Sequence, residues 1–373
     1  MGLTKKAIRR LGLGDAAGHL LAPLAKDSAP LPSPEEARAL LTALRPDAGS
    51  SALTDTPLPP LADEVDVDVI VPAYNMAPYL SACLDSVFSQ EAACRFRVIA
   101  VDDGSTDESG AILDACADPR LTVIHQENRG LAGARNRGIE AASAPYLYYL
   151  DADDMLAPGC LQALYACARE EDAALVEGAF CSVRADGSRL RSDPHAEGPL
   201  PEGSSAFGFV CGKLFRRELF SRIRFPEGYL FEDSILSQLL LPLAAAKGWR
   251  TFGISNESFY YRQNAAGIVR SSRGSQNSID SLWVTLRLYR DRQTLGLTND
   301  QRYYEYILNM LVLTRRRTEA LEDEVGRAVF VLWREFLLRE FPAFSTGRPA
   351  YRMLEDAVRG GDYGRYRLFC SLH

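Results

Sequence analysis

From residue 65 onward the chain alternates short runs of apolar, β-branched residues with amphipathic segments of helical period. The alternation begins at VDVDVIVP (65–72) and continues to about residue 180. It predicts βαβ units around a parallel sheet, because a strand returns parallel to its neighbour only after a crossover connection. Such crossovers are right-handed, so the predicted sheet is doubly wound. We expect strands near 66–71, 96–101, 120–125, 146–150 and 173–180, and helices near 77–89, 107–117, 131–143 and 159–171.

The segments that flank this region have other patterns. Residues 1–63 are rich in Pro, Ala and Ser and carry one short capped helical pattern, so they are expected to form a partly flexible appendage. The polar, turn-rich stretch 182–206 is expected to be a loop or flap. Three segments after residue 275 have apolar stripes at helical spacing. The predicted domains are 1–63, an α/β domain at 64–274 with halves 64–180 and 181–274, and a helical C-terminal subdomain at 275–373.

Composition excludes some classes of function. A net charge of −7 argues against a general affinity for nucleic acid, which requires a basic face. The eight cysteines form no CxxC pair and no zinc-ligand spacing, which favours reduced thiols and a cytoplasmic location. The longest apolar run, 239–246, is far shorter than the roughly 20 residues that span a bilayer. The basic, amphipathic start MGLTKKAIRRLGLG leaves a peripheral membrane contact open, although a solvated helix end is favoured.

Two predicted strands end in carboxylates. YLYYLDADDM (146–155) supplies Asp151, Asp153 and Asp154, and FRVIAVDDGSTDES (96–109) supplies Asp102 and Asp103. Carboxylates this close repel one another, and a divalent cation with oxygen ligands would stabilise them. The alternative is an acidic turn. Because the carboxyl ends of parallel strands lie along one edge of a sheet, both clusters are expected to face the same cleft.

Two further segments suit a nucleotide. The first strand ends in VPAYNMAPYL, where an aromatic face beside the amide of Asn75 suits a nucleobase, although an ordinary strand-to-helix turn is the alternative. In HQENRGLAGARNRGIEAA the glycines, the helix start and the guanidinium groups of Arg135 and Arg137 suit phosphate oxygens. A solvated helix face is the alternative for both arginines. Base, diphosphate and divalent cation together describe a nucleotide-activated substrate.

The set VPAYN, VDDGSTD, NRGLAGARNRG and LDADD, in this order over residues 66–155, resembles the family 2 inverting glycosyltransferases of GT-A fold. The resemblance implies a Rossmann-like, mostly parallel sheet and a DxD motif, in which Asp153 and Asp151 bind Mn²⁺ or Mg²⁺. It implies that Asp103 reads a uracil-type base and that Arg135 meets the base or the diphosphate. The nucleotide-sugar-binding residues that it implies in this region are Pro72, Tyr74, Asn75, Asp103, Asn128, Arg135 and Asp151.

The second half of the family pattern resembles three later segments, CGKLFRRELF (211–220), RFPEGYLFEDSIL (224–236) and FYYRQNAAGIVRSS (259–272). The resemblance implies that Asp233 is the catalytic base, next to Glu232, and that Lys213 and Arg262 place positive charge near the leaving diphosphate.

The acidic pair and Lys213 also have structural alternatives. The acidic pair could cap a helix that begins near Ser234. Lys213 could belong to a solvated basic helix face, and this is the interpretation adopted for Arg216 and Arg217. The four histidines are assigned no role.

The expected activity is transfer of a sugar, with inversion, from a nucleotide-sugar donor. We expect this donor to be UDP-linked. The acceptor would be a glycan, a lipid-linked saccharide or a polyol phosphate. A non-catalytic relative that binds nucleotide sugar or glycan is the alternative, although the DxD motif and the base are both intact. A nucleotidyltransferase would carry a Gly-rich basic loop after the first strand, and VPAYNMAPYL has none.

Overall fold

The computed structural model describes residues 25, 27, 29–201, 204–205, 207–264, 267 and 274–373. The basic pattern at 1–14 lies outside the described residues. The chain divides into two compact units. An α/β unit contains residues 49–267 and 287–297, and a helical unit contains the described residues of 1–48, 268–286 and 298–373. Residues 49–63 thus belong with the sheet rather than with the preceding helix.

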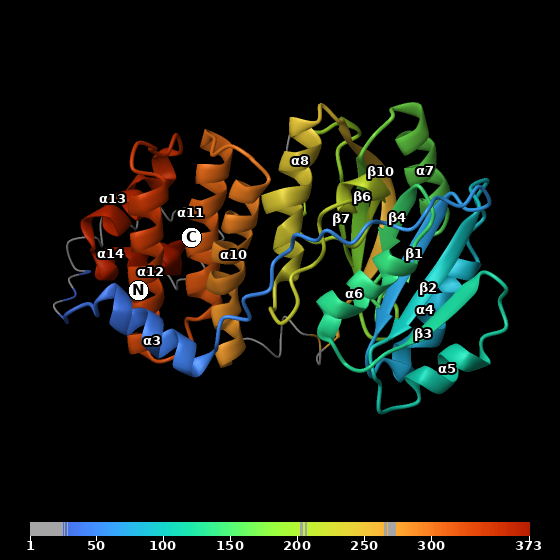
Figure 1. Ribbon diagram of the computed structural model, residues 1–373, viewed down its shortest axis with the longest axis horizontal. Helices are drawn as coiled ribbons and strands as arrows, with labels where there is room; N and C mark the ends of the chain where they lie inside the picture. Colours follow the sequence, from blue (N-terminus) through green and yellow to red (C-terminus); the bar gives the residue numbers. More distant parts are fainter. Residues whose placement is uncertain are drawn as a thin grey trace. The chain divides into compact units, whose positions relative to one another are not determined.

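One sheet forms the centre of the α/β unit (Figure 1). Its strand order is β3-β2-β1-β4-β9-β6-β10-β5, with β7 paired to β6 and β8 to β10. The strands are β1 (Val67–Ala73), β2 (Phe96–Asp102), β3 (Leu121–His125), β4 (Tyr146–Tyr149), β5 (Met155–Leu156), β6 (Leu175–Val183), β7 (Arg189–Asp193), β8 (Gly198–Pro199), β9 (Lys213–Arg216) and β10 (Thr251–Arg262). The first four strands run parallel, so the predicted mostly parallel α/β sheet is confirmed.

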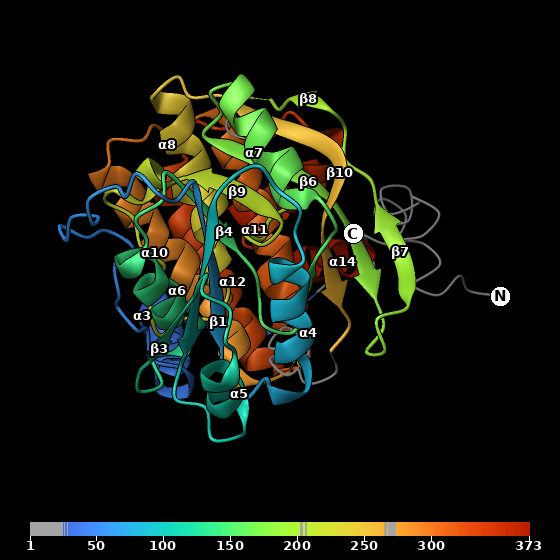
Figure 2. The ribbon, with the colours of Figure 1, turned by 90° about the vertical axis from the view of Figure 1, so that its right-hand side faces the viewer.

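Helices cover both faces of this sheet. They are α4 (Ala77–Phe88), α5 (Ser109–Ala115), α6 (Gly130–Ala141), α7 (Cys160–Glu170) and α8 (Leu241–Ala246). Successive strand residues point to opposite faces, and Val69 accordingly lies in the apolar cluster that includes residues of α4 and α7. Ile70 faces α6, where a Cβ added at Gly138 would lie 2.4 Å from Ile70 Cγ2. Figure 2 shows α4 and α6 on opposite sides of β1, as a doubly wound sheet requires.

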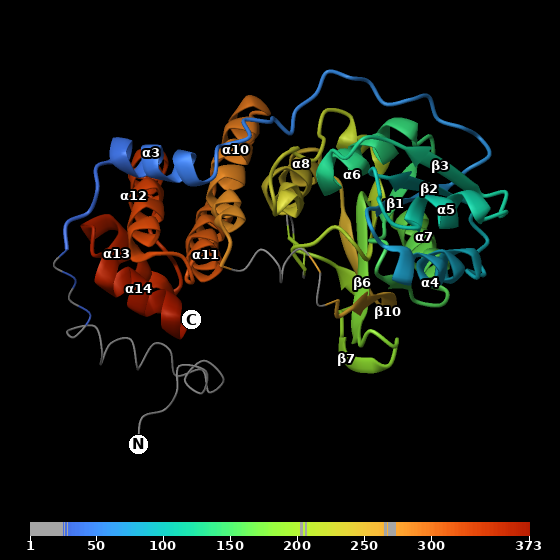
Figure 3. The same cartoon turned by 90° about the horizontal axis from the view of Figure 1, so that it is seen from below.

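The expectation of a loop at 182–206 is wrong in part, because this stretch contains β7 and β8. All residues of β7 except Asp193 are exposed, and its main chain pairs with β6. A strand without a buried face has no apolar alternation, so the sequence RLRSD gives no strand signal. Figure 3 shows β7 beside β6 at the margin of the α/β unit.

The helical unit contains α3 (Pro34–Leu44), α11 (Gln301–Arg317), α12 (Asp323–Glu340), α13 (Arg352–Gly360) and α14 (Tyr363–Leu372), while α10 (Asp280–Thr294) contributes to both units. Helix α3 packs on α12 and begins with the predicted cap, in which Ser33 and Glu36 bond each other's main chain. The sequence predicted α10, α11 and α12 but not α13 and α14, which are short and separated only by Gly361 and Asp362.

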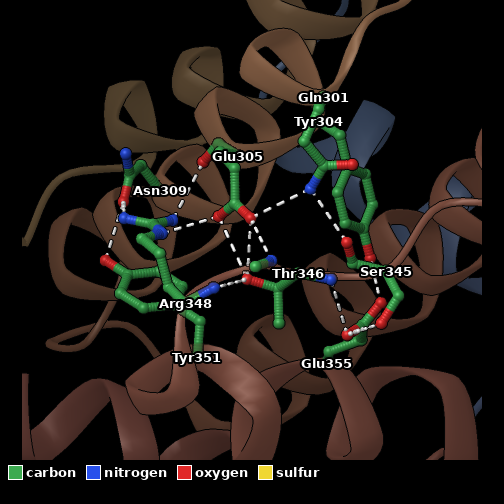
Figure 4. Close-up of polar contacts among 10 residues, drawn as sticks. Gln301, Tyr304, Glu305, Asn309, Ser345, Thr346, Arg348, Tyr351 and Glu355 are labelled. Carbon is green, nitrogen blue, oxygen red and sulfur yellow. Dashed lines mark hydrogen bonds and ion pairs between the residues drawn. The ribbon is translucent and has the colours of Figure 1, made fainter.

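A polar network fixes the chain between α12 and α13 (Figure 4). The carboxylate of Glu305 on α11 accepts hydrogen bonds from Thr346 Oγ1 at 2.8 Å, Gly347 N at 2.9 Å and Arg348 Nε at 2.6 Å. Glu355 on α13 accepts from Ser345 Oγ at 3.1 Å. The network therefore pins this connection to two helices of the same unit.

Two absences concern the described part of the chain. None of its helices is both long enough and apolar enough to cross a membrane. All eight cysteines are free thiols, as the sequence predicted.

Candidate active site

The acidic loop after β4 lies at the carboxyl edge of the parallel strands. Asp151 has a side chain that is 35% exposed. Asp153 is half-buried and accepts a hydrogen bond from Asn264 Nδ2 at 3.1 Å. Burial and the charge of Asp151 raise the pKa of Asp153. Burial and the charge of Asp153 raise the pKa of Asp154 well above its usual value. The loop therefore holds more negative charge than its surroundings neutralise.

This excess of negative charge fits a divalent cation. Asp151 and Asp153 each have one carboxylate oxygen engaged in a hydrogen bond, to Arg135 and Asn264 respectively, and within the described part of the chain no side chain donates to the second oxygen of either group. Among the residues that the structure describes, no three His, Cys, Asp or Glu side chains are grouped to hold a metal ion. The residues present thus fit an ion that takes two carboxylates from the protein and its other ligands from substrate and water, as Mg²⁺ commonly does.

Arg135 joins this loop to the second acidic cluster. It lies on α6, its side chain is 1% exposed, and its guanidinium group is 5.2 Å from the ring centroid of Phe225. Nη2 donates to Asp151 Oδ1 at 2.9 Å, whereas Nη1 donates to Glu232 Oε1 at 2.8 Å and to Asp233 Oδ1 at 2.7 Å. One guanidinium therefore brings together three of the predicted site residues. Its donors point at protein carboxylates rather than at open space for a diphosphate.

The charges at this junction do not balance, because three carboxylates share one guanidinium. Burial and the charge of Asp233 raise the pKa of Glu232, and burial raises the pKa of Asp233, with a further contribution from Asp151. Burial lowers the pKa of Arg135, but the three carboxylates outweigh it and hold that pKa well above its usual value. Arg135 therefore remains a cation, while the acidic pair can retain a proton.

The backbone that presents the acidic pair is strained. Phe231, directly before it, has a φ of 66°, a left-handed conformation that costs energy for a bulky residue. The 3₁₀ turn Glu232–Ser234 follows, and then the π-helix Leu236–Leu240. Neither segment has a side-chain cap, so the capping alternative for the acidic pair is not supported. Strain and π-helical turns are frequent at functional sites.

Helix α6 also holds the main chain that leads to the acidic pair. Asn136 Nδ2 donates to the carbonyl of Phe225 at 2.9 Å, and the amide of Phe225 donates to Asn136 Oδ1 at 2.8 Å. Arg129 forms an ion pair with Glu227 at 2.7 Å. The segment 225–233 is thus attached to α6 at three points.

The residues expected at the base lie along the same sheet edge. Asp103 is 2% exposed, and its Oδ1 accepts from Gln126 Nε2 at 2.7 Å and from Arg129 N at 2.8 Å. Pro72 is buried in β1, and Tyr74, two residues later, is 45% exposed. An exposed ring beside a buried carboxylate is available to a flat ligand.

The two asparagines at this edge shape turns. Asn75 has a φ of 54°, and its Oδ1 accepts from Thr106 N at 2.8 Å, which ties the end of β1 to the turn after β2. Asn128 Oδ1 accepts from Gly130 N at 3.2 Å, at the start of α6. Their carbonyl oxygens are therefore engaged within the protein.

Lys213 is placed differently from the expectation. It lies on β9 rather than on a helix, so the solvated helix face is wrong for it, and it is 1% exposed. Its Nζ is 3.1 Å from Glu177 Oε2 and 4.7 Å from the ring centroid of Phe209. The structure therefore pairs this ammonium group with a buried carboxylate and does not bring it to the acidic loop.

The helix-face interpretation is also wrong for the two neighbouring arginines. Arg216 lies on β9, and Arg217 is 6% exposed and donates to the carbonyls of Ala142 at 2.7 Å and Pro59 at 2.8 Å. Both side chains therefore hold the protein together.

Arg262 supports the acidic loop. Its Nε donates to the carbonyl of Asp153 at 2.8 Å, its amide donates to Asp154 Oδ1 at 2.8 Å, and its Nη1 donates to the carbonyl of Ala185 at 2.5 Å. It is 6% exposed and lies over the ring of Tyr79. The structure thus places Arg262 behind the loop.

Sequence reasoning missed several residues of the site. Asn264, which bonds Asp153, follows Arg262 by two positions in the same quoted segment and could have been found there. His195 was given no role but is 8% exposed, with its Nε2 2.8 Å from Glu177 Oε1. No local sequence signal marks it, because His195 lies between β7 and β8 whereas Glu177 lies on β6.

Comparisons with known proteins find similar sequences. Residues 68–224 match the family model of glycosyl transferase family 2. The chain is 31% identical over 225 residues to glycosyltransferase GlyG of Streptococcus pneumoniae, covering 55% of this chain and 73% of GlyG. It is 32% identical over 216 residues to the uncharacterized glycosyltransferase EpsJ of Bacillus subtilis, covering 53% of this chain and 61% of EpsJ. It is 36% identical over 163 residues to the succinoglycan biosynthesis protein ExoO of Rhizobium meliloti, covering 43% and 47%.

A solved structure has a similar fold. The crystal structure of S. aureus TarS 1–349 in complex with UDP-GlcNAc matches with a TM-score of 0.62 and 18% identity, over 81% of this chain and 90% of that one. The predicted GT-A architecture is thereby confirmed at the level of fold. On the family model and the relatives together, this chain belongs to glycosyl transferase family 2.

Proposed function

We propose that the protein transfers a sugar from a nucleotide-sugar donor, UDP-linked, to a hydroxyl group of a glycan, a lipid-linked saccharide or a polyol phosphate, with inversion. The observation that carries this proposal is the shared guanidinium of Arg135, which holds Asp151 and Asp233 at 2.9 Å and 2.7 Å. A carboxylate suited to a cation and a carboxylate suited to a proton therefore lie beside one another. TarS, which has the same fold, was crystallised with UDP-GlcNAc.

At the donor side, Asp151 and Asp153 would hold Mn²⁺ or Mg²⁺. When bound, the cation would stabilise the negative charge that develops on the departing diphosphate. Asp103 and Tyr74 would take the base, the first by hydrogen bonding and the second by stacking. Arg262 would keep the acidic loop in position through the carbonyl of Asp153. Lys213, paired with Glu177, would support the sheet beneath the site.

At the acceptor side, Asp233 would act as the general base. Arg135 holds its Oδ1, and the side chain is 26% exposed, so Oδ2 can receive the proton of an acceptor hydroxyl. Proton transfer to a positioned carboxylate contributes about 10²–10⁴-fold in rate. A single displacement needs only this base, and inversion at the sugar carbon follows from it.

The names of the relatives suggest a broader role. ExoO is named as a succinoglycan biosynthesis protein. We propose that this protein likewise contributes to a polysaccharide, in the cell envelope, and that it acts in the cytoplasm or at the inner face of the membrane. The chain covers 47% of ExoO, so this role is inferred from part of that protein.

The proposal is tested first by ligand binding. A panel of nucleotide sugars is scored by thermal shift with and without Mn²⁺, because a ligand of the native state raises the melting temperature according to its affinity. We expect one nucleotide sugar to raise the melting temperature, and to do so only in the presence of Mn²⁺. The variant Asp153→Asn should lose this shift, whereas the control Asp186→Asn, in the exposed turn before β7, should keep it. If no nucleotide sugar shifts the parent protein, the proposal fails.

Turnover separates the enzyme from its alternative, a relative that binds nucleotide sugar without transfer. With the donor identified, release of the free nucleotide is followed in the presence of mixed glycan acceptors. Release that disappears in Asp233→Asn supports the transferase. Binding without any release, in parent and variant alike, supports the binding protein.

A further inference from the structure

Both terminal nitrogens of Arg135 bind protein carboxylates. Its side chain is 1% exposed, and both hydrogen bonds of Nη1 go to the acidic pair, one to Glu232 and one to Asp233. Nη2 is bonded to Asp151. Nε is buried and has no acceptor in the described part of the chain. Because the side chain is 1% exposed and both terminal nitrogens bind carboxylates, a diphosphate would meet this guanidinium only after the acidic side chains around it had moved.

The surrounding attachments keep this arrangement rigid. Asn136, the next residue of α6, exchanges two hydrogen bonds with the main chain of Phe225. Arg129, about two turns before Asn136, binds Glu227 and donates its amide to Asp103. A shift of the main chain that carries the acidic pair would therefore break further bonds between the segment 225–233 and the region of α6.

From this geometry we infer that Arg135 is a positioning residue: through Nη1 it orients Asp233, and through Nη2 it competes with the divalent cation for Asp151. The inference rests on the proposed function and deepens it. With Oδ1 held at 2.7 Å, Asp233 presents its other oxygen to the acceptor. A cation on Asp151 weakens the bond from Nη2, and by reciprocity Nη2 weakens the cation's hold on Asp151.

The planar guanidinium is required for this role. Its fork of N–H groups reaches three carboxylates at once, whereas the ammonium group of lysine is a point charge on a flexible stem. Arg135→Lys keeps the charge but not the three fixed directions. Arg135→Met removes the charge and keeps most of the length. Arg137→Met is the matched control on the same helix, because the side chain of Arg137 is 43% exposed and forms an ion pair with Glu140.

The first measurement uses Mn²⁺ alone, with free ion followed by electron paramagnetic resonance. Without the competing guanidinium, we expect Arg135→Met to bind Mn²⁺ about fivefold or more tightly than the parent, within the range of ordinary couplings between sites. Arg137→Met should match the parent. Mn²⁺ binding that is unchanged or weaker in Arg135→Met would overturn the inferred competition between Arg135 and the cation. So would a parent protein without affinity for Mn²⁺. Arg135→Lys supplies the same comparison if the methionine variant does not fold, and its Mn²⁺ affinity should also rise.

The second measurement uses the donor found in the panel. We expect kcat of Arg135→Lys to fall about 10²-fold or more, as for loss of an oriented base, while the KM for the donor changes less than threefold. A donor KM that rises while kcat holds would overturn the inference, because it would make Arg135 a diphosphate ligand. The Mn²⁺ measurement needs neither donor nor acceptor. The competition between Arg135 and the cation can therefore be tested even if the proposed sugar transfer is not observed.

Discussion

Arg262 donates a hydrogen bond of 2.8 Å to the main-chain carbonyl of Asp153, across 109 positions of sequence. The contact exists because β10 runs beside β6 and ends next to the loop that follows β4. Its amide also bonds the side chain of Asp154. The last long strand of the sheet thus holds in place a loop whose own charges repel one another. The buried guanidinium group of Arg262 lies behind the loop and limits that repulsion. It does so without bonding the acidic side chains that face outward.

The repulsion itself predicts a conflict between activity and stability at Asp153. The folded protein raises the pKa of this group, so its contribution to stability is present below the unfolded pKa and is lost as pH rises through the folded pKa. At pH 7 the charged group therefore costs stability. We expect Asp153→Asn to raise the melting temperature of the metal-free protein at pH 7 and to abolish metal-dependent turnover. A lower melting temperature at pH 7 would contradict this account.

Asp233→Asn tests the base. The amide can still accept the bond from Arg135 Nη1, so the site should keep its shape, but it cannot take a proton. We expect kcat to fall about 10²–10⁴-fold, with the dissociation constant for donor and Mn²⁺ unchanged within about threefold. Steady-state kinetics and calorimetric donor binding check the two parts separately. Full activity in this variant would remove Asp233 from the mechanism.

The pH dependence of kcat should reflect the coupled acidic pair. Burial and the charge of Asp233 raise the pKa of Glu232 to about 7, and burial also raises the pKa of Asp233. A base works only when ionised, so kcat should fall as pH drops through neutrality, and the apparent pKa belongs to the pair. Glu232→Gln removes one of the two like charges and should move this acid limb to lower pH. An acid limb that stays in place would show that the pair is not coupled.

Much of the α/β unit was predictable because its signals are local. Apolar runs that end in Asp102, Asp103 and Asp151 mark both the strands and the edge where the site lies. Which charges meet was not predictable, because Arg135 finds Asp233 only through the path of the segment 225–233. Lys213 illustrates the same limit. Its partner Glu177 is set by the register of β9 against β6, which no short stretch of sequence specifies.

The helical unit should depend on Glu305. Burial raises the pKa of this group, but hydrogen bonds from Thr346, Gly347 and Arg348 lower it by more, so the net pKa lies below its usual value. Its stabilisation is thus present above the unfolded pKa and lost as pH falls through the folded pKa. We expect Glu305→Gln to lower the free energy of unfolding at pH 7 by about 1–3 kcal/mol.

Hydrogen exchange locates this effect. Amides of residues 345–351 should exchange faster in Glu305→Gln than in the parent, while Glu319→Gln, an exposed position after α11, should leave them unchanged. The difference in stability between Glu305→Gln and the parent should shrink as pH falls through the lowered folded pKa of Glu305, below which the carboxylate is protonated in both states. Equal exchange in parent and variant at pH 7 would contradict the role given to Figure 4's network.

Lys213 and Glu177 distinguish a structural ion pair from a substrate contact. Both side chains are almost fully buried, 3.1 Å apart, and burial lowers the pKa of Lys213. Removing the ammonium group leaves the buried carboxylate of Glu177 with the imidazole of His195 at 2.8 Å but without its lysine partner. Loss of one partner of a buried ion pair typically costs about 3–5 kcal/mol, whereas replacing both costs far less. We expect Lys213→Met to be strongly destabilised and the double variant Lys213→Met/Glu177→Gln to recover most of the loss, as measured by urea unfolding.

If Lys213 only supports the sheet, the double variant should also keep the donor KM within about threefold of the parent, close to the scatter of additive effects. If the ammonium group instead meets the diphosphate, stability would recover while the donor KM stayed high. That outcome would return Lys213 to the binding site from which its pairing with Glu177 separates it.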